Sequence, residues 1–147
     1  MNRTSVVAVA LAAAVVWSCG ASETIRRVTY PPAFRYLEQH DVTSAMWRLA
    51  RDVRGLKGLL GGADGLSPES HREVIRLLHD MEATAGEIDP KGRRSTHPRI
   101  DRNIEAFRRD LAMARQAAER DPPNYFLAGN VAGSCSYCHE GQREGAR

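Results

Sequence analysis

The sequence predicts an all-α protein, and three observations support this fold class. Ala, Leu and Arg, which favour helices, are abundant among the 147 residues, whereas aromatic residues make up only 6%. Apolar residues recur in alternating steps of four and three positions along several long segments, as on the buried face of an amphipathic helix. Clusters of Pro and Gly separate these segments, and no stretch shows the apolar–polar alternation of a strand.

Residues 1–18 have the features of a bacterial signal peptide. Arg3 gives the positively charged start, and residues 6–16 contain only Val, Ala and Leu. This apolar run is too short for a helix that spans a membrane. We therefore expect the chain to be exported to the periplasm.

The signal peptide ends in a sequence that resembles a lipobox, the cleavage site of lipoprotein signal peptidase. Residues 16–18, Val-Trp-Ser, precede Cys19. The resemblance implies that Cys19 is lipidated and anchors the protein to a membrane, because several acyl chains together hold a protein stably. Gly20 after the cysteine favours the outer membrane over the inner one. The alternative is cleavage near Ala21, which would leave a soluble periplasmic protein.

Residues 19–40 are expected to form a tether or extended arm, because they contain Tyr-Pro-Pro at 30–32 and no sustained apolar period. The folded domain is expected over residues 41–147. Its first helix is predicted at 41–60, before the helix-ending pair of glycines at 61–62. The apolar stripe of this helix consists of Val42, Met46, Leu49, Val53, Leu56 and Leu60.

Two further helices follow, at 68–88 and 98–120. Ser67 and Pro68 form a helix start, and Pro98 suits the first turn of the next helix. Their apolar stripes are Val74, Leu78, Met81, Ala85 and Ile88 in the first, and Ile100, Ile104, Phe107, Leu111, Ala114 and Ala118 in the second.

A last helix is predicted at 124–143, after a break at Asp-Pro-Pro-Asn. Gly129 and Gly133 each weaken it by about 1 kcal/mol relative to Ala. Because glycine has no side chain, these positions would either let a flat group or another helix come close to the backbone, or leave this helix kinked. Four amphipathic helices with short connections predict an antiparallel four-helix bundle.

The predicted last helix contains the sequence Cys135-Ser136-Tyr137-Cys138-His139. C-x-x-C-H is the attachment signature of c-type haem, because two thiols three positions apart lie near one helix face and the following imidazole reaches the iron. The motif predicts one covalently attached haem c, held by Cys135 and Cys138 with His139 as an axial iron ligand. Zinc sites also use such residues, but the usual second pair of ligands is absent from this sequence.

The position of the motif near the C-terminus resembles the class II c-type cytochromes, the cytochrome c prime group and its low-spin relatives. These proteins are four-helix bundles with the motif in the last helix, and the similarity covers residues 41–143. Arg143 stands four places after His139, where the family often has an arginine, but Gln142 replaces the aromatic residue that often precedes it. The family includes members that pair through their first two helices, so the resemblance also implies a homodimer.

The resemblance also bears on the distal side of the haem. Low-spin members have a methionine early in the first helix, so Met46 would be the distal iron ligand; high-spin members leave the iron five-coordinate. From the sequence pattern itself, Met46 lies on the apolar stripe and is also suited to simple core packing. The alternative ligands are His40, His71, His79 and His97, each more typical of a solvated surface.

These features predict an electron carrier of the bacterial periplasm rather than an enzyme. No constellation for acid–base or nucleophilic chemistry accompanies the motif. Its partners would be periplasmic or membrane redox proteins, and the basic run 91–94 would either steer an acidic partner or form an ordinary solvated loop. The alternative function is a five-coordinate haem protein that binds nitric oxide or carbon monoxide. The net charge of +3, with both signs interleaved, gives no indication of nucleic-acid binding.

Overall fold

The computed structural model describes residues 31–62 and 66–139, and this part of the chain is mostly helical. The all-α prediction is therefore confirmed. The helices are α3 (Gln39–Leu60), α4 (Pro68–Ile88), α5 (Pro98–Ala118), α6 (Phe126–Asn130), the 3-10 helix η1 (Val131–Cys135) and α7 (Ser136–His139). The structure also has two short strands that the sequence did not predict, β1 (Phe34–Arg35) and β2 (Arg94–Ser95).

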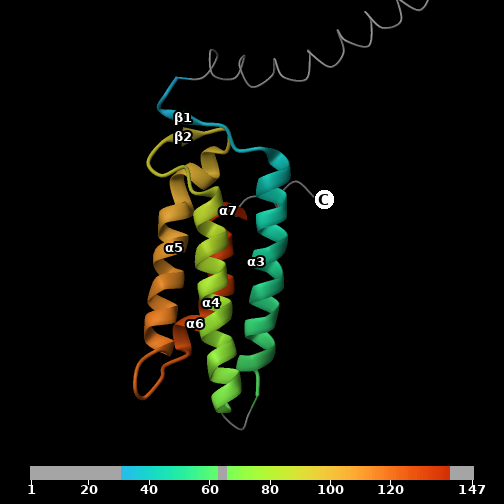
Figure 1. Cartoon of the computed structure of the whole chain (residues 1–147), viewed down its shortest axis with the longest axis vertical. Coiled ribbons are helices and arrows are strands. Elements are labelled where there is room, and N and C mark those ends of the chain that lie inside the picture. Colours follow the sequence, from blue (N-terminus) through green and yellow to red (C-terminus); the bar gives the residue numbers. More distant parts are fainter. Residues whose placement is uncertain (1–30, 63–65, 140–147) are drawn as a thin grey trace, which may run out of the picture. The chain divides into compact units, whose positions relative to one another are not determined.

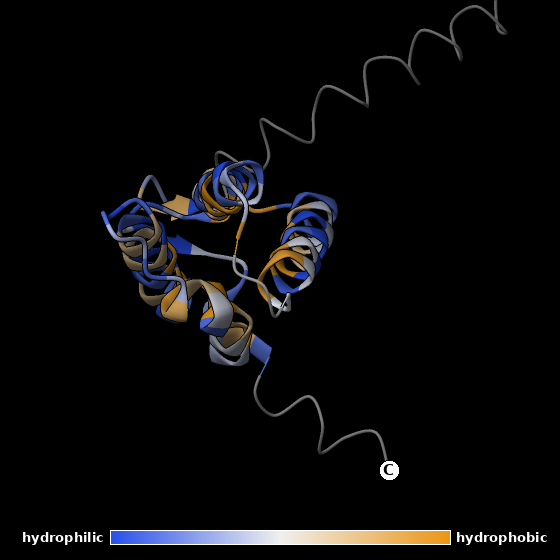
Figure 2. Ribbon diagram, turned by 90° about the horizontal axis from the view of Figure 1, so that it is seen from below, coloured by the Kyte–Doolittle hydropathy of each residue, from blue (hydrophilic) through white to orange (hydrophobic). Residues whose placement is uncertain are grey.

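The chain divides into two units, Met1–Arg35 and Tyr36–Arg147, and every helix named above lies in the second. Within that unit α4 packs against both α3 and α5, and consecutive long helices run in opposite directions (Figure 1). The segment α6–η1–α7 runs back along α5, and α6 also contacts α3. Figure 2 shows that the hydrophobic sides of the long helices face the interior.

The long helices begin and end close to the predicted residues. The bounds of α4 are those predicted, and Ser67 caps it by accepting a 3.1 Å hydrogen bond from the backbone N–H of Ser70. Helix α3 begins two residues earlier than predicted, and α5 ends two residues earlier. Such differences are within the usual uncertainty of helix ends.

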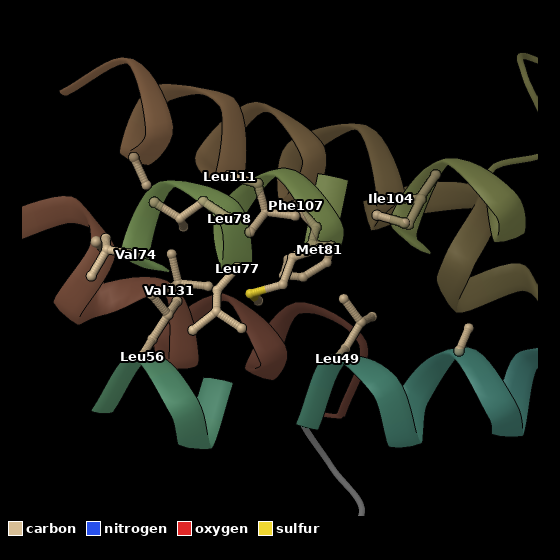
Figure 3. Close-up of a cluster of buried hydrophobic side chains, with 14 of the residues drawn as sticks. Leu49, Leu56, Val74, Leu77, Leu78, Met81, Ile104, Phe107, Leu111 and Val131 are labelled. Carbon is tan, nitrogen blue, oxygen red and sulfur yellow. The ribbon is translucent and has the colours of Figure 1, made fainter. Parts of the chain in front are cut away.

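The core is formed by the predicted apolar stripes. Its largest fully buried side chains are Leu56, Leu78, Met81, Ile88, Leu111 and Val74, and several of them appear in Figure 3. The stripe of α3 is buried less completely, since Val42 and Met46 are only half-buried. Val42 and Met46 border a cavity, described below, and Val53 and Leu60 further along α3 are half-buried as well.

The predicted fourth helix is not continuous, which corrects the expectation of a single helix over 124–143. It is a short α-helix, a 3-10 helix and a final helical turn, and residues 140–143 lie outside the described part of the chain. Gly129 and Gly133 lower the helix propensity of this segment. Polar side chains also compete for its backbone: Asn130 Nδ2 donates to the carbonyl of Phe126 at 2.8 Å, and Ser136 Oγ donates to that of Gly133 at 2.8 Å.

The loop between α4 and α5 is fixed by the buried carboxylate of Asp89. This carboxylate pairs with Arg108 on α5 and accepts a 2.7 Å hydrogen bond from the backbone N–H of Lys91. Lys91 and Gly92 both have positive φ, at 54° and 76°, so the chain turns tightly here. Because Asp89 ends α4 and Arg108 lies in α5, this pair ties the loop to the packed helices.

None of the helices in residues 31–62 and 66–139 combines the length and apolarity that crossing a membrane requires.

Replacing Met81 by Ala tests the core packing. Met81 is 0% exposed, so the change should lower the free energy of unfolding by about 2–5 kcal/mol. The matched control is Met113→Ala, because Met113 is 44% exposed and its loss should cost about 0.5 kcal/mol or less. Urea denaturation of both variants measures the difference, and equal losses would contradict this description of the core.

Candidate functional site

A cavity of about 450 Å³ lies between α3, α5 and the C-terminal segment, by which we mean α6, η1 and α7 together. Its volume is within the range of cofactor pockets, about 300–1,000 Å³. Most of its lining is apolar. The lining residues are Val42, Thr43, Met46, Trp47, Leu49, Ala50, Ile88, Ile100, Ile104, Phe107, Ser134, Cys135, Cys138 and His139.

The cavity brings together the residues that the sequence analysis selected. Cys135, Cys138 and His139 lie in its wall on the C-terminal segment, and Met46 lies in its wall on α3. Periodicity explains the position of Met46, which belongs to the inward stripe of α3. The sequence could not show that this stripe faces the Cys-x-x-Cys-His motif.

Groups of α5 bind the motif, mainly at the motif's backbone carbonyls. Asn103 Nδ2 donates a 2.7 Å hydrogen bond to the carbonyl of Tyr137, and an Arg99 guanidinium nitrogen donates to that of Cys138 at 3.2 Å. The Cys138 thiol lies 3.8 Å from the Arg99 carbonyl oxygen and donates to it. Arg99 and Asn103 are one helical turn apart, so both reach the same segment.

A second set of contacts involves the carboxylate of Asp110. Its Oδ2 accepts hydrogen bonds from Ser134 Oγ at 2.7 Å and from the Tyr137 hydroxyl at 2.9 Å. Ser134 directly precedes the motif and Tyr137 lies inside it. The sequence analysis did not identify Asp110 or Asn103. In the sequence, Asn103 and Asp110 belong to a row of polar residues beside the apolar stripe of α5. Such a row indicates that the side chains lie near the surface, but it does not show which residues they bind.

The two motif cysteines are free thiols in the structure. Burial raises the pKa of the Cys135 thiol above its ordinary value. The pKa of the Cys138 thiol is also raised, first by burial and then by the charge of Cys135, while Arg99 opposes the shift. Both side chains therefore remain protonated and weakly nucleophilic at neutral pH.

Trp47 is the most exposed of the cavity-lining aromatic side chains. It is 67% exposed and stands next to Met46 on α3. It lies off the buried stripe of α3. Because it both lines the cavity and contacts solvent, it marks a place where the cavity meets the surface.

The other histidines lie elsewhere. His71 shares a 2.7 Å hydrogen bond with the Tyr125 hydroxyl, His97 is the N-cap residue of α5, and His40 is exposed beside Asp41. His79 is exposed on α4. Among the described histidines only His139 lines the cavity, so the structure gives no support to the other four as distal ligands.

Several predicted features lie outside the described residues: the signal peptide at 1–18, Cys19 and its lipid, and Gln142 and Arg143 after the motif. The predicted arm at 19–40 is described only from residue 31, where it includes β1 and the first two residues of α3.

Within residues 31–62 and 66–139, no three His, Cys, Asp or Glu side chains lie close enough to hold a metal ion by themselves. The zinc hypothesis therefore finds no assembled ligand set in that part of the chain.

In comparisons with known proteins, the chain matches no family model, no curated protein and no solved structure.

The raised pKa values can be tested by alkylation of the full chain produced without haem. In the folded protein, the rate at which iodoacetamide modifies Cys135 and Cys138 should rise with pH at a higher midpoint than in urea, because burial disfavours the thiolate. Mass spectrometry of the modified peptides reads each cysteine separately. A lower midpoint in the folded protein would show activated thiols instead.

Proposed function

We propose that this protein is a monohaem c-type cytochrome of the bacterial periplasm that carries electrons. The observation that supports this function best is that Cys135, Cys138, His139 and Met46 line one cavity. A second support is the course of the helices, which we interpret as an antiparallel four-helix bundle. The resemblance to class II c-type cytochromes agrees with both.

The residues of the cavity fit a covalently attached haem. Two thiols are free for thioether bonds, an imidazole follows them, and apolar side chains form most of the wall. When bound, the haem supplies one-electron redox chemistry. Cys135 and Cys138 would attach the porphyrin, His139 would be the proximal ligand, and Met46 the distal one.

The remaining lining residues would set the environment of the haem. Leu49, Ile104 and Phe107 exclude water from the inner wall of the cavity, and such a low-dielectric, poorly hydrated setting is one of the means by which proteins tune haem potentials. A thioether ligand raises the potential relative to a second histidine. Trp47 at the surface would lie on the route by which electrons pass to partner redox proteins.

The alternative function, binding of nitric oxide or carbon monoxide at five-coordinate haem, is favoured by one observation. Met46 is half-buried and packs against the hydrophobic core, so its side chain also serves as a packing residue. If it does not ligate the iron, a small gas could take the distal position.

The deciding measurement is the optical spectrum of the exported protein, reduced and oxidised, before and after Met46→Ala. The starting protein should be low-spin with a near-infrared methionine–iron band. The variant should lose that band, become high-spin and bind carbon monoxide readily, because it lacks the distal thioether. Met113→Ala, on an exposed face of α5, is the matched control and should keep the original spectrum.

Other outcomes have distinct meanings. A high-spin starting protein that binds carbon monoxide would favour the gas-binding function. Absence of any haem spectrum, in protein from cells able to attach c-type haem, would overturn the assignment of the motif.

The lipid anchor is tested by Cys19→Ser. The variant should move from the membrane fraction to the soluble periplasmic fraction, because the acyl chains would have no attachment site. Its haem spectrum should not change, since Cys19 is separate from the Cys-x-x-Cys-His motif. A variant that has lost residues 1–18 and still stays in the membrane fraction would rule out anchoring through this cysteine.

A further inference from the structure

The side chain of Asp110, on α5, accepts hydrogen bonds from two side chains around the motif. One carboxylate oxygen, Oδ2, accepts from Ser134 on one side and from Tyr137 on the other. Ser134 also lines the cavity, so the Asp110 carboxylate is hydrogen-bonded directly to a residue of the cavity wall. Asp110 itself is half-buried and is not a lining residue.

The segment that Asp110 contacts cannot hold its shape by helix formation alone. Helices of four or five residues are too short to be stable in isolation, and Gly129 and Gly133 weaken this one further. Some of its backbone carbonyl groups accept hydrogen bonds from side chains of the same segment. The direction in which Cys135, Cys138 and His139 point must therefore depend on contacts with a rigid neighbour, and α5 is that neighbour.

The geometry points to Asp110 as a positioning residue of the haem site, beside Arg99 and Asn103, which bind the backbone of the motif. Its carboxylate holds Ser134 and Tyr137, and thereby keeps the two thiols and the imidazole facing the cavity, while its negative charge sets the electrostatic environment of the iron. This inference rests on the proposed haem-binding function. Asp110 acts through Ser134 and Tyr137 and does not itself bind the haem.

The charge has a predictable sign. A negative carboxylate near the haem stabilises the ferric form, which carries one more positive charge than the ferrous form. Removing that charge should therefore move the reduction potential in the positive direction. The two hydrogen bonds to Asp110 have a separate effect. Hydrogen bonds to a charged group are stronger than hydrogen bonds between neutral groups, so these two oppose local opening of the segment.

Two variants separate these effects. Asp110→Asn removes the charge but keeps an oxygen that can accept hydrogen bonds, whereas Asp110→Ala removes both. Ser134→Ala and Tyr137→Phe each delete one donor and are mild enough to fold if Asp110→Ala does not. Glu105→Gln is the matched control, since it removes one negative charge from an exposed position of the same helix.

The first measurement is the reduction potential of the exported, haem-loaded full chain. Asp110→Asn and Asp110→Ala should both shift it in the positive direction, and Glu105→Gln should shift it much less. Tyr137→Phe keeps the charge, so its shift should be smaller than that of Asp110→Asn. Equal shifts in Asp110→Asn and Glu105→Gln would overturn the electrostatic role.

The second measurement is hydrogen exchange of the amides at 131–139, followed by mass spectrometry on the full chain with and without haem. In Asp110→Ala the exchange should be about tenfold faster, because two hydrogen bonds to a charged group that oppose local opening are gone. Ser134→Ala and Tyr137→Phe should each accelerate exchange by a smaller factor, and Glu105→Gln should leave it unchanged. Unchanged exchange in all three variants would overturn the positioning role.

Failure of the inference can be told apart from failure of the proposed function. Haem-loaded wild-type protein with Asp110 variants that behave like Glu105→Gln would refute the inference alone. Wild-type protein without haem, from cells able to attach it, would refute the function and with it the role of Asp110 at a haem site.

Discussion

The apolar face of α4 is buried between α3 and α5, with Val74, Leu78, Met81 and Ala85 all 0% exposed. Burial of this face removes a large apolar area from water, the main favourable term in folding. It also fixes α3 and α5 on either side of α4. On the side away from α4, the C-terminal segment packs along α5 but contacts α3 mainly through α6. A cavity beside Met46 and Phe107 therefore stays open between α3 and α5.

The C-terminal segment shows how a weak element can be placed accurately. Its glycines and its competing side-chain hydrogen bonds make it a poor helix, yet α5 contacts it along much of its length. Side chains of α5 bind both its backbone and its hydroxyl groups. A segment of this kind depends on its neighbour for its conformation, and local opening costs less there than in the core. Such a segment could accept a covalently attached group without disturbing the long helices.

No Asp, Glu, Lys or Arg is among the described residues that line the cavity. Ion pairs such as Arg76 with Glu73 and Arg76 with Asp80 lie on the exposed face of α4, as the interleaved charges of the sequence predict. Exposed pairs of this kind add little stability. The cavity wall is mostly apolar, and burial there raises the pKa of both motif thiols. The outer surface therefore keeps the protein solvated, while the inner wall provides an apolar setting in which a charge would have a large effect.

The sequence by itself determined the helices and the motif. The spacing of apolar residues and the signals at Ser67, Pro68 and Pro98 are local properties, so they located α3, α4 and α5 to within two residues. The tertiary structure decided which helix faces meet. Met46 lines the cavity of the Cys-x-x-Cys-His motif, and Asp110 binds Ser134. Both contacts depend on how the packed helices are rotated and shifted relative to one another, and the periodicity of the sequence does not determine this. The interruption of the last helix has local causes, because Gly129 and Gly133 lower its helix propensity and the side chains of Asn130 and Ser136 bond to carbonyl groups of the same segment.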